Sequence, residues 1–339
     1  MPSSTARPVR RARISSLATY VPPRLLTNAD LEKLVATSNE WILQRTGIEQ
    51  RHIVEKGVGT SDLAKEAALL AIERAGLTPA DIDLIIVGTT TPDTVFPSTA
   101  CRLQAKIGAT NAWGFDLGAA CSGFTYGLTT AAGLVTAGAS EHALVVGGDV
   151  MSSIIDYTDR ATCVIFGDGA GAVVVEASDD DRTGIIDFEN YVDGREGEAL
   201  QLPAGGSLLP TSAETVAERL HYVKQDGQAV FRFAISNTQK ACRRLLDRHG
   251  LSADDIDLFV SHQANRRIIQ SAAEKLGLAP EKVVINIERY GNTTAGTIPL
   301  ALDDAVRAGR LKRGDLVLLA SVGAGFTVGA VLLRWGTTT

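Results

Sequence analysis

The chain of 339 residues repeats part of its own sequence at about half its length, and this duplication restricts the folds that it can adopt. Residues 77–84 (LTPADIDL) align with residues 251–258 (LSADDIDL), and five of the eight pairs are identical. A second echo relates residues 135–138 (VTAG) to residues 306–309 (VRAG). A period near half the chain length indicates two related halves rather than a solenoid. A site at their junction draws residues from both halves.

Strand-like and helix-like segments alternate within each half. Helices are expected over residues 28–36, 61–75, 98–107, 123–135, 233–249, 266–276 and 300–308. Strands are expected over residues 13–17, 84–90, 114–117, 143–150, 172–176, 183–190, 258–261, 283–287, 316–321 and 327–334. This alternation indicates an α/β protein with a mainly parallel sheet that helices cover on both faces.

The same pattern divides the chain into three parts. Residues 1–12 are rich in Arg and Ser and are expected to form a flexible N-terminal tail, followed by a first half over residues 13–182 and a second half over residues 183–339. A glycine-rich stretch over residues 193–217 is expected to leave the core as a surface excursion.

Composition narrows the class of protein. A formal net charge of −6 disfavours general nucleic-acid binding, and no run approaches the roughly 20 apolar residues of a membrane span. Cys101, Cys121, Cys163 and Cys242 are too widely spaced to indicate a zinc site or a disulfide framework. We expect a cytoplasmic protein.

Cys121 is the first candidate for chemistry. It lies in the stretch 115–124 (FDLGAACSGF), which is typical of a strand, a sharp turn of small residues and the start of an apolar helix. A thiol there faces the positive end of the helix dipole, and we expect this to favour the nucleophilic thiolate. The alternative is that Cys121 is a small buried hydrophobic residue.

Three loops of the second half also follow predicted strands or lead into predicted helices. They are residues 261–265 (SHQAN), 290–296 (YGNTTAG) and 321–326 (SVGAGF). The carboxyl ends of strands are where open α/β sheets bind ligands. Each loop has a structural alternative, because His262 can be a buried histidine, Asn292 a turn residue, and the last loop a plain hairpin.

Taken together, these groups suit one chemistry. A thiolate attacks a thioester and holds its acyl group, while the neutral imidazole of His262 and the amide of Asn292 donate hydrogen bonds to a second thioester carbonyl. No carboxylate stands out in these loops as a base, which favours decarboxylation of a malonyl unit over proton abstraction. Backbone N–H groups at Cys121 and at the 323–325 turn are expected to form the oxyanion hole. The product is a new carbon–carbon bond.

The motifs AACSGF (119–124), HQAN (262–265) and GNT (291–293) resemble the Cys–His–Asn triad of the β-ketoacyl-acyl-carrier-protein synthase III family. Further matching motifs are SNEWI (38–42), RTGI (45–48), FPS (96–98) and FGDGAG (166–171). The resemblance covers residues 14–335. It implies a thiolase-like fold, in which two duplicated βαβ halves form a layered α/β/α/β/α core. It also implies a cytoplasmic homodimer without metal or redox cofactor, which initiates fatty-acid synthesis by condensing a short acyl-CoA, expected to be acetyl-CoA, with malonyl-acyl-carrier protein.

The resemblance assigns roles to individual residues. Cys121 carries the acyl group, and His262 and Asn292 promote the decarboxylative condensation. The other implied sites are the oxyanion hole (backbone of Cys121 and Ala324), the coenzyme A site (Trp41, Arg45 and Arg160), the acyl pocket (Phe96, Met151 and Val322) and the carrier-protein docking surface (Gln263, Ala264, Asn265, Arg266 and Arg267, with Arg232 and Lys275 as neighbours). Trp41 with Arg160 is expected to sandwich the adenine of coenzyme A, although a helix residue and a surface cation are the simpler reading of that pair.

Three positions depart from the family pattern. Val322 stands where a bulky aromatic residue is usual, which predicts a roomier pocket. Ala324 replaces a glycine in the oxyanion turn, and Glu274 stands where the docking surface often has lysine. A condensing enzyme of a specialised pathway with a longer acyl primer is therefore the main alternative.

Other classes fit less well. A Cys–His–Asn thioester hydrolase uses the same residue types but needs its imidazole paired with the thiol. A non-catalytic acyl-CoA binding protein has no need of an intact Cys121, His262 and Asn292. A biosynthetic thiolase needs a second cysteine near the last glycine turn, and residues 323–325 (GAG) contain none.

Overall fold

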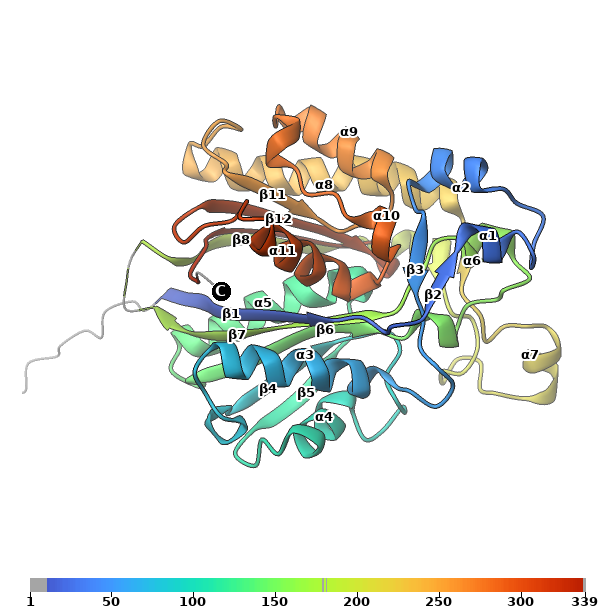
Figure 1. Cartoon of the computed structure of the whole chain (residues 1–339), viewed down its shortest axis with the longest axis horizontal. Helices are drawn as coiled ribbons and strands as arrows, with labels where there is room; N and C mark the ends of the chain where they lie inside the picture. The colour runs from blue at the N-terminus through green and yellow to red at the C-terminus, as the bar shows by residue number, and fades with distance from the viewer. Residues whose placement is uncertain (1–10, 179, 181, 338–339) are drawn as a thin grey trace, which may run out of the picture.

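The computed structural model describes residues 11–178, 180 and 182–337, which form two β-sheets with helices between and outside them (Figure 1). The five-stranded sheet has the order β1-β7-β6-β4-β5, and the four-stranded sheet has the order β11-β12-β13-β8. The strands of the first sheet are β1 (Arg11–Tyr20), β4 (Leu84–Gly88), β5 (Trp113–Leu117), β6 (His142–Asp149) and β7 (Gly169–Ser178). Those of the second are β8 (Gly184–Val192), β11 (Leu258–Ser261), β12 (Leu316–Gly323) and β13 (Thr327–Arg334). The chain thus completes one sheet before it begins the other.

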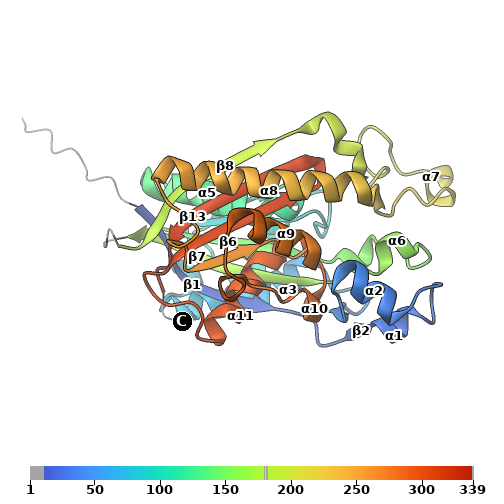
Figure 2. The same cartoon turned by 90° about the horizontal axis from the view of Figure 1, so that it is seen from above.

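The helices form three layers, and the expected α/β/α/β/α arrangement is confirmed. The central layer consists of α5 (Gly123–Thr136) and α11 (Thr297–Arg307), whose buried residues pack with both sheets in one cluster. The outer layers consist of α3 (Thr60–Arg74) and α4 (Thr99–Ile107) on the first sheet, and α8 (Gly227–His249) and α9 (Arg266–Leu276) on the second. Figures 1 and 2 show α8 and α9 on the side of the molecule opposite α3 and α4.

The duplication seen in the sequence is visible in the strand order. Read from their first strands, the sheets run β1-β7-β6-β4-β5 and β8-β13-β12-β11. The counterpart of β5 is reduced to one parallel bridge between Val283 and Phe259. The predicted strand over 283–287 is therefore wrong, because this run lies at the sheet edge and turns into α10 (Ile287–Tyr290) after a single bridge.

The prediction of a mainly parallel sheet is also wrong. Only the pairs β4–β5, β4–β6 and β11–β12 are parallel, whereas β1–β7, β6–β7, β12–β13 and β8–β13 are antiparallel. In each half the last strand returns directly beside its predecessor, and the first strand pairs with that returning strand. Local patterns of apolar residues do not distinguish the two directions.

Several element bounds differ from expectation. Arg11 and Ala12 belong to β1, so the expected tail over 1–12 is too long, and its residues 1–10 lie outside the described residues. Helix α8 begins at Gly227 rather than at the expected residue 233, because the Asp226 carboxylate caps the N–H groups of Gln228 and Ala229. Helix α1 (Asn28–Leu31) is shorter than the expected 28–36.

The remaining elements are short and lie around one end of the sheets. They are β2 (Leu25–Thr27), β3 (Gln50–His52), β9 (Leu200–Gln201), β10 (Lys224–Gln225), α2 (Asn39–Thr46), α6 (Arg160–Cys163) and α7 (Ala213–Ala217). Helix α7 belongs to the expected surface excursion and projects from the body of the molecule (Figure 1).

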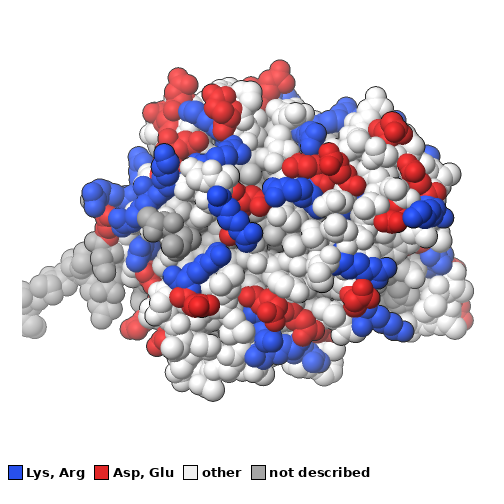
Figure 3. Space-filling model, viewed as in Figure 1, with Lys and Arg blue, Asp and Glu red and all other residues white. Residues whose placement is uncertain are grey.

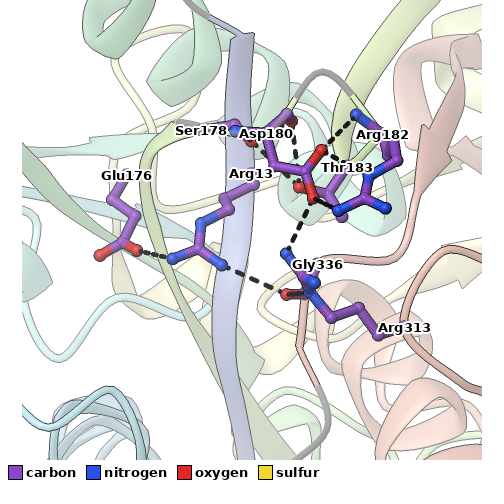
Figure 4. A network of polar contacts seen from close by, with 8 residues as sticks. All are labelled: Arg13, Glu176, Ser178, Asp180, Arg182, Thr183, Arg313 and Gly336. Atoms are coloured by element: carbon purple, nitrogen blue, oxygen red, sulfur yellow. Dashed lines mark hydrogen bonds and ion pairs between the residues drawn. The ribbon is translucent and has the colours of Figure 1, made fainter.

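A polar network joins β1 and Gly336, which follows β13, to the segment that connects the two sheets (Figure 4). Arg13 of β1 binds Glu176 Oε1 through Nη2 at 2.5 Å and donates through Nη1 to the carbonyl of Gly336 at 3.3 Å. Arg313 binds Asp180, which lies between β7 and β8, at 3.2 Å. These contacts hold the two halves together at the connection between their sheets.

The surface carries both signs of charge. Lys and Arg side chains alternate with Asp and Glu side chains over the face shown in Figure 3. Among the helices that the structure describes, none is both long and apolar enough to cross a membrane.

Candidate active site

Cys121 lies at the tip of a strained turn between β5 and α5. The 3-10 turn Ala120–Ser122 begins with Ala120 in the left-handed region, at φ 47°. The turn is held from the other half, because the Thr327 hydroxyl donates to the Ala119 carbonyl at 2.9 Å. A Cβ at Gly323 would lie 2.7 Å from the backbone N of Cys121, so only glycine allows the end of β12 to approach the nucleophile this closely.

Cys121, His262 and Asn292 line a single cavity, as the sequence predicted. They are 6 %, 7 % and 5 % exposed, so each reaches the cavity from a buried position. Cys121 comes from the first half, and the other two come from the second. The last glycine turn, with Val322 and Ala324, lines the same cavity.

His262 is held as a neutral imidazole. It follows β11, and its backbone N–H donates to the Ala320 carbonyl at 2.7 Å. Its Nδ1 lies 2.7 Å from the Thr297 hydroxyl, which leaves Nε2 as the nitrogen available to a substrate. Burial lowers the pKa of His262 to about 3, because a charged ring there would lose its hydration.

Asn292 is held so that its amide can donate. Its backbone N–H donates to Ile165 O at 2.9 Å, and its carbonyl accepts from Gly167 N at 3.0 Å. Its side-chain Oδ1 accepts from the backbone N–H of Thr294 at 2.8 Å. Oδ1 is thus already bonded, and Nδ2 remains as the hydrogen-bond donor.

The expectation of a stabilised thiolate at Cys121 is contradicted. Burial, and then the nearby Asp149 carboxylate, raise the pKa of the Cys121 thiol to about 12. The favourable helix end is outweighed by loss of hydration in a fully buried position.

The arrangement of the triad distinguishes a synthase from a hydrolase. A Cys–His hydrolase pairs its imidazole with the thiol. Within the described residues, no hydrogen bond joins the Cys121 thiol to His262, whose Nδ1 is paired with Thr297. This arrangement disfavours the hydrolase.

A second cavity meets the first at Cys121. Its lining includes Thr90, Met151, Ile154, Leu202, Val223 and Ala324, mostly apolar groups suited to an acyl chain. Met151 therefore lines a cavity next to the thiol, and its role in an acyl pocket stays a prediction.

The other two predicted acyl-pocket residues lie elsewhere. Val322 lines the cavity that contains His262 and Asn292, on the other side of the thiol. Phe96 is 83 % exposed and lines neither cavity within the single chain.

The oxyanion turn tolerates its alanine. Positive φ in this turn belongs to Gly325 (71°) and Phe326 (52°), so Ala324 occupies an ordinary conformation. Ala324 lines both cavities beside Cys121, and its part in an oxyanion hole stays a prediction.

The three predicted coenzyme A residues meet on the surface. The guanidinium of Arg160 lies 4.8 Å and that of Arg45 lies 5.6 Å from the ring centroid of Trp41. Trp41 and Arg45 come from α2, which Ser38 caps and Gly47 ends at φ 82°. An aromatic ring stacked with guanidinium groups suits a nucleobase and its phosphates.

Arg266 and Arg267 of the predicted docking surface lie at the N-terminal end of α9, whereas the predicted neighbour Lys275 lies in its last turn. Arg267 is exposed and stacks over the Phe231 ring at 5.2 Å, whereas Arg266 pairs with Glu288 at 3.2 Å. Asn265 caps α9, and its Nδ2 donates to the Arg45 carbonyl at 2.8 Å. This last bond joins the predicted carrier surface to the coenzyme A site.

Gln263 and Ala264 differ from the exposed cations. Gln263 is 1 % exposed and bonds the carbonyls of Ser261 and Val284 and the N–H of Asn286, so it braces the loop and cannot touch a partner. Ala264 lines the cavity of the triad.

Sequence reasoning missed the groups that hold the triad in place. Thr294 and Thr297 orient Asn292 and His262, and Asp149 binds Thr294. The residue offset that aligns 77–84 with 251–258 also aligns Ala120 with Thr294. This alignment was the one sequence signal that the turn at Thr294 corresponds to the turn that carries Cys121. Among the described residues, no three His, Cys, Asp or Glu side chains gather as they do around a metal ion.

Known proteins resemble this chain over nearly all of its length. The family model of 3-oxoacyl-[acyl-carrier-protein] synthase III matches residues 115–194, and the model of its C-terminal part matches residues 246–335. The β-ketoacyl-[acyl-carrier-protein] synthase III of Solibacter usitatus is 59% identical over 327 residues, which cover 96% of this chain and 99% of that protein. The corresponding crystal structure from Aquifex aeolicus has a TM-score of 0.89 at 42% identity and covers 96% of this chain and 100% of its own. The priming β-ketosynthase of the R1128 polyketide pathway has a TM-score of 0.89 at 35% identity, covering 98% of this chain and 99% of its own.

Proposed function

The chain belongs to the 3-oxoacyl-acyl-carrier-protein synthase III family, and we propose that its reaction runs through Cys121, His262 and Asn292. The enzyme is an acyltransferase that condenses an acyl-CoA with malonyl-acyl-carrier protein at the start of fatty-acid synthesis. The observation that carries the residue roles is the shared cavity, in which a thiol from one half faces two hydrogen-bonding side chains from the other.

In the first half-reaction, the sulfur of Cys121 attacks the carbonyl carbon of the acyl-CoA thioester. The backbone N–H groups of Cys121 and Ala324 stabilise the negative oxygen of the tetrahedral intermediate. The intermediate collapses to acyl-Cys121 as the bond to the coenzyme A sulfur breaks. Coenzyme A leaves as a thiol, because its sulfur takes up the proton that the Cys121 thiol gives up. The raised pKa of that thiol means that proton loss accompanies substrate binding rather than preceding it.

In the second half-reaction, the Thr297 hydroxyl donates to Nδ1 of His262, so the single ring proton of the neutral imidazole is on Nε2. The malonyl thioester carbonyl accepts hydrogen bonds from this Nε2–H and from Nδ2–H of Asn292. Loss of CO₂ leaves an enolate, whose oxygen these two donors stabilise. The enolate carbon attacks the acyl-Cys121 carbonyl, and the carbon–sulfur bond to Cys121 breaks as the 3-oxoacyl product forms. The Cys121 thiolate then takes up a proton from water, which restores the thiol. Burial keeps His262 neutral, so the pair stabilises charge by hydrogen bonding, and neither half-reaction calls for a metal or redox cofactor.

The primer is proposed to be short, with acetyl as the first candidate. Its chain enters the cavity beside Met151, and the coenzyme A adenine stacks on Trp41 with Arg160 while Arg45 meets the phosphates. The acidic carrier protein is proposed to dock on the cations around Arg267, with Arg266 and Arg232 as neighbours.

The molecule is proposed to act as a cytoplasmic homodimer. Strand β5 forms the edge of its sheet, and its Trp113 is 53 % exposed. Val95 and Phe96, which precede α4 in the sequence, are 87 % and 83 % exposed. An edge strand with exposed apolar groups is suited to pairing with a second copy. In such a dimer Phe96 can reach the acyl cavity of the partner copy, which agrees with its position outside the cavities of its own chain.

The test is intact-protein mass spectrometry after incubation with acetyl-, butyryl-, hexanoyl- and octanoyl-CoA. We expect one acetyl adduct in the wild type and in Cys101→Ala, no adduct in Cys121→Ala, and a 3-oxoacyl product after addition of malonyl-carrier protein. Preferential loading of octanoyl would favour a specialised pathway of the kind served by the polyketide-priming neighbour. Absence of an adduct with every acyl-CoA would overturn the role of Cys121.

A further inference from the structure

A buried carboxylate outside the triad links the half that carries the nucleophile to the loop that carries Asn292. Asp149 is the last residue of β6 and is 0 % exposed. Its Oδ2 accepts a hydrogen bond from the Thr294 hydroxyl and faces Ala295 N at 3.5 Å. Within the described residues it forms no ion pair, so hydrogen bonds alone hold this group in the core.

The other oxygen of Asp149 is crowded with donors. Oδ1 accepts from the hydroxyls of Thr89, Thr90 and Thr91 at 2.8, 3.0 and 2.9 Å, and from the backbone N–H groups of Thr90 and Thr91 at 2.7 and 3.0 Å. These residues follow β4, in the same half as Cys121. The carboxylate is therefore fixed by the first half and presents its Oδ2 to the second.

Thr294 passes this constraint to Asn292. Its backbone adopts φ 51°, a conformation that a β-branched residue rarely enters unless its surroundings hold it there. In that conformation its N–H donates to Asn292 Oδ1 at 2.8 Å. The bond decides which end of the Asn292 amide remains to donate to a substrate.

We propose that Asp149 is a positioning residue for the condensation step, which acts through Thr294 to keep the Asn292 amide aimed as a donor. The inference rests on the proposed role of Asn292. It also explains why an anion is tolerated beside a thiol whose ionisation it opposes, since the same carboxylate is needed for the second half-reaction. Removal of the Asp149 charge is then expected to slow the condensation, while the acetylation of Cys121 stays undiminished or becomes faster.

Asp149→Asn is the first test, because it keeps the shape and removes the charge. The new amide oxygen is expected at the Oδ1 position, where five donors converge, so its NH₂ group faces Thr294 and Ala295 N. The Thr294 hydroxyl then donates to the Thr293 carbonyl and accepts from a neutral NH₂ group, and the Ala295 N–H faces a donor. A charge-assisted bond is thus replaced by a neutral one, and the Thr294 link weakens. We expect condensation from acetyl-Cys121 to slow about tenfold or more in single-turnover assays. Acetylation of Cys121 is expected to be undiminished or faster.

A double-mutant cycle separates positioning from general damage. If Asp149 acts through Asn292, then Asp149→Asn slows the wild type but does not further slow Asn292→Ala. Equal slowing in both backgrounds would overturn the proposal, as would unchanged condensation in Asp149→Asn. Loss of acetylation in the wild type would instead count against the role of Cys121, so the two failures are distinguishable.

A matched pair of threonine variants keeps the test open if Asp149→Asn does not fold. Thr294→Val and Thr89→Val each remove one hydroxyl from the same carboxylate, but on Oδ2 and Oδ1 respectively. We expect Thr294→Val to slow condensation at least fivefold more than Thr89→Val, with both chains acetylated normally. Equal effects of the two variants would show that Asp149 has only a structural role.

Discussion

Ala120 and Thr294 occupy equivalent positions in the two halves and adopt the same left-handed backbone conformation, with φ of 47° and 51°. Each begins a 3-10 turn that leads into a central helix, α5 or α11. One turn presents Cys121 and the other fixes Asn292. The duplicated halves therefore use one strained turn twice, for two different chemical tasks.

The strain at Ala120 is measurable. Ala120→Val places a β-branched side chain at positive φ and is expected to lower the free energy of unfolding by about 1–2 kcal/mol. The control is Ala137→Val at the exposed end of α5, where φ is −72° and the expected loss is about 0.6 kcal/mol. Urea denaturation measures both. Equal losses of unfolding free energy in the two variants would show that the backbone at Ala120 is not strained.

The alkylation rate of Cys121 is expected to depend steeply on pH. Burial and then the nearby Asp149 carboxylate raise its thiol pKa to about 12, and neutral His262 lines the same cavity. Because the thiolate is the nucleophile, the iodoacetamide rate should rise about tenfold per pH unit from 7 to 9. The assay uses Cys101→Ser, since Cys101 is exposed. A plateau below pH 8 would show an activated thiolate instead.

The condensation step is expected to be insensitive to pH in the range where free histidine titrates. The pKa of His262 is lowered to about 3, so its ring stays neutral as pH falls from 8 to 5. Single-turnover condensation from acetylated enzyme should change less than about twofold over that range. A decline centred near pH 6.5 would mean that His262 has the ordinary pKa of an exposed ring.

Removal of the Trp41 ring tests the adenine site. We expect Trp41→Ala to raise the KM for acetyl-CoA about tenfold with little change in kcat, since a base stacked on an aromatic ring contributes about 1–3 kcal/mol. Acetyl-N-acetylcysteamine lacks the nucleotide and serves as the control substrate. If the KM values of both substrates rise equally in Trp41→Ala, then Trp41 supports the fold and does not bind the adenine.

Chain-length preference should follow the cavity beside Met151. Met151→Ala enlarges that cavity and is expected to shift loading from acetyl towards hexanoyl and octanoyl. Val322→Ala also shortens an apolar side chain, but in the cavity on the other side of Cys121. It should leave the preference unchanged in competition assays that mix two acyl-CoAs. A larger shift in Val322→Ala would show that the chain occupies the other cavity.

Much of the fold could be predicted where local signals define both ends of an element. Helix α9 has the predicted bounds, because Asn265 caps its start and Gly277 ends it at φ 80°. Helix α2 carries similar signals at Ser38 and Gly47 but was missed, since its eight residues show little apolar periodicity. Strand direction depends on pairing between distant segments, so the antiparallel pairs could not be predicted from local patterns.

The triad was predictable, whereas its supports were not. Cys121, His262 and Asn292 stand in short runs of small and polar residues that mark strand-end loops. Asp149 binds a residue 145 positions away, and no local pattern indicates that contact. The state of the Cys121 thiol was predicted wrongly for the same reason. A helix end is visible in the sequence, but the burial that outweighs it comes from the assembled halves.

The bond from the Thr327 hydroxyl to the Ala119 carbonyl has a consequence for biosynthesis. Thr327 opens β13, the last strand among the described residues, which completes the second sheet. A ribosome that has already delivered Cys121 must therefore continue as far as Thr327 before the turn around that thiol is secured. The nascent chain therefore carries Cys121 through the synthesis of residues 122–327 without a working site around it.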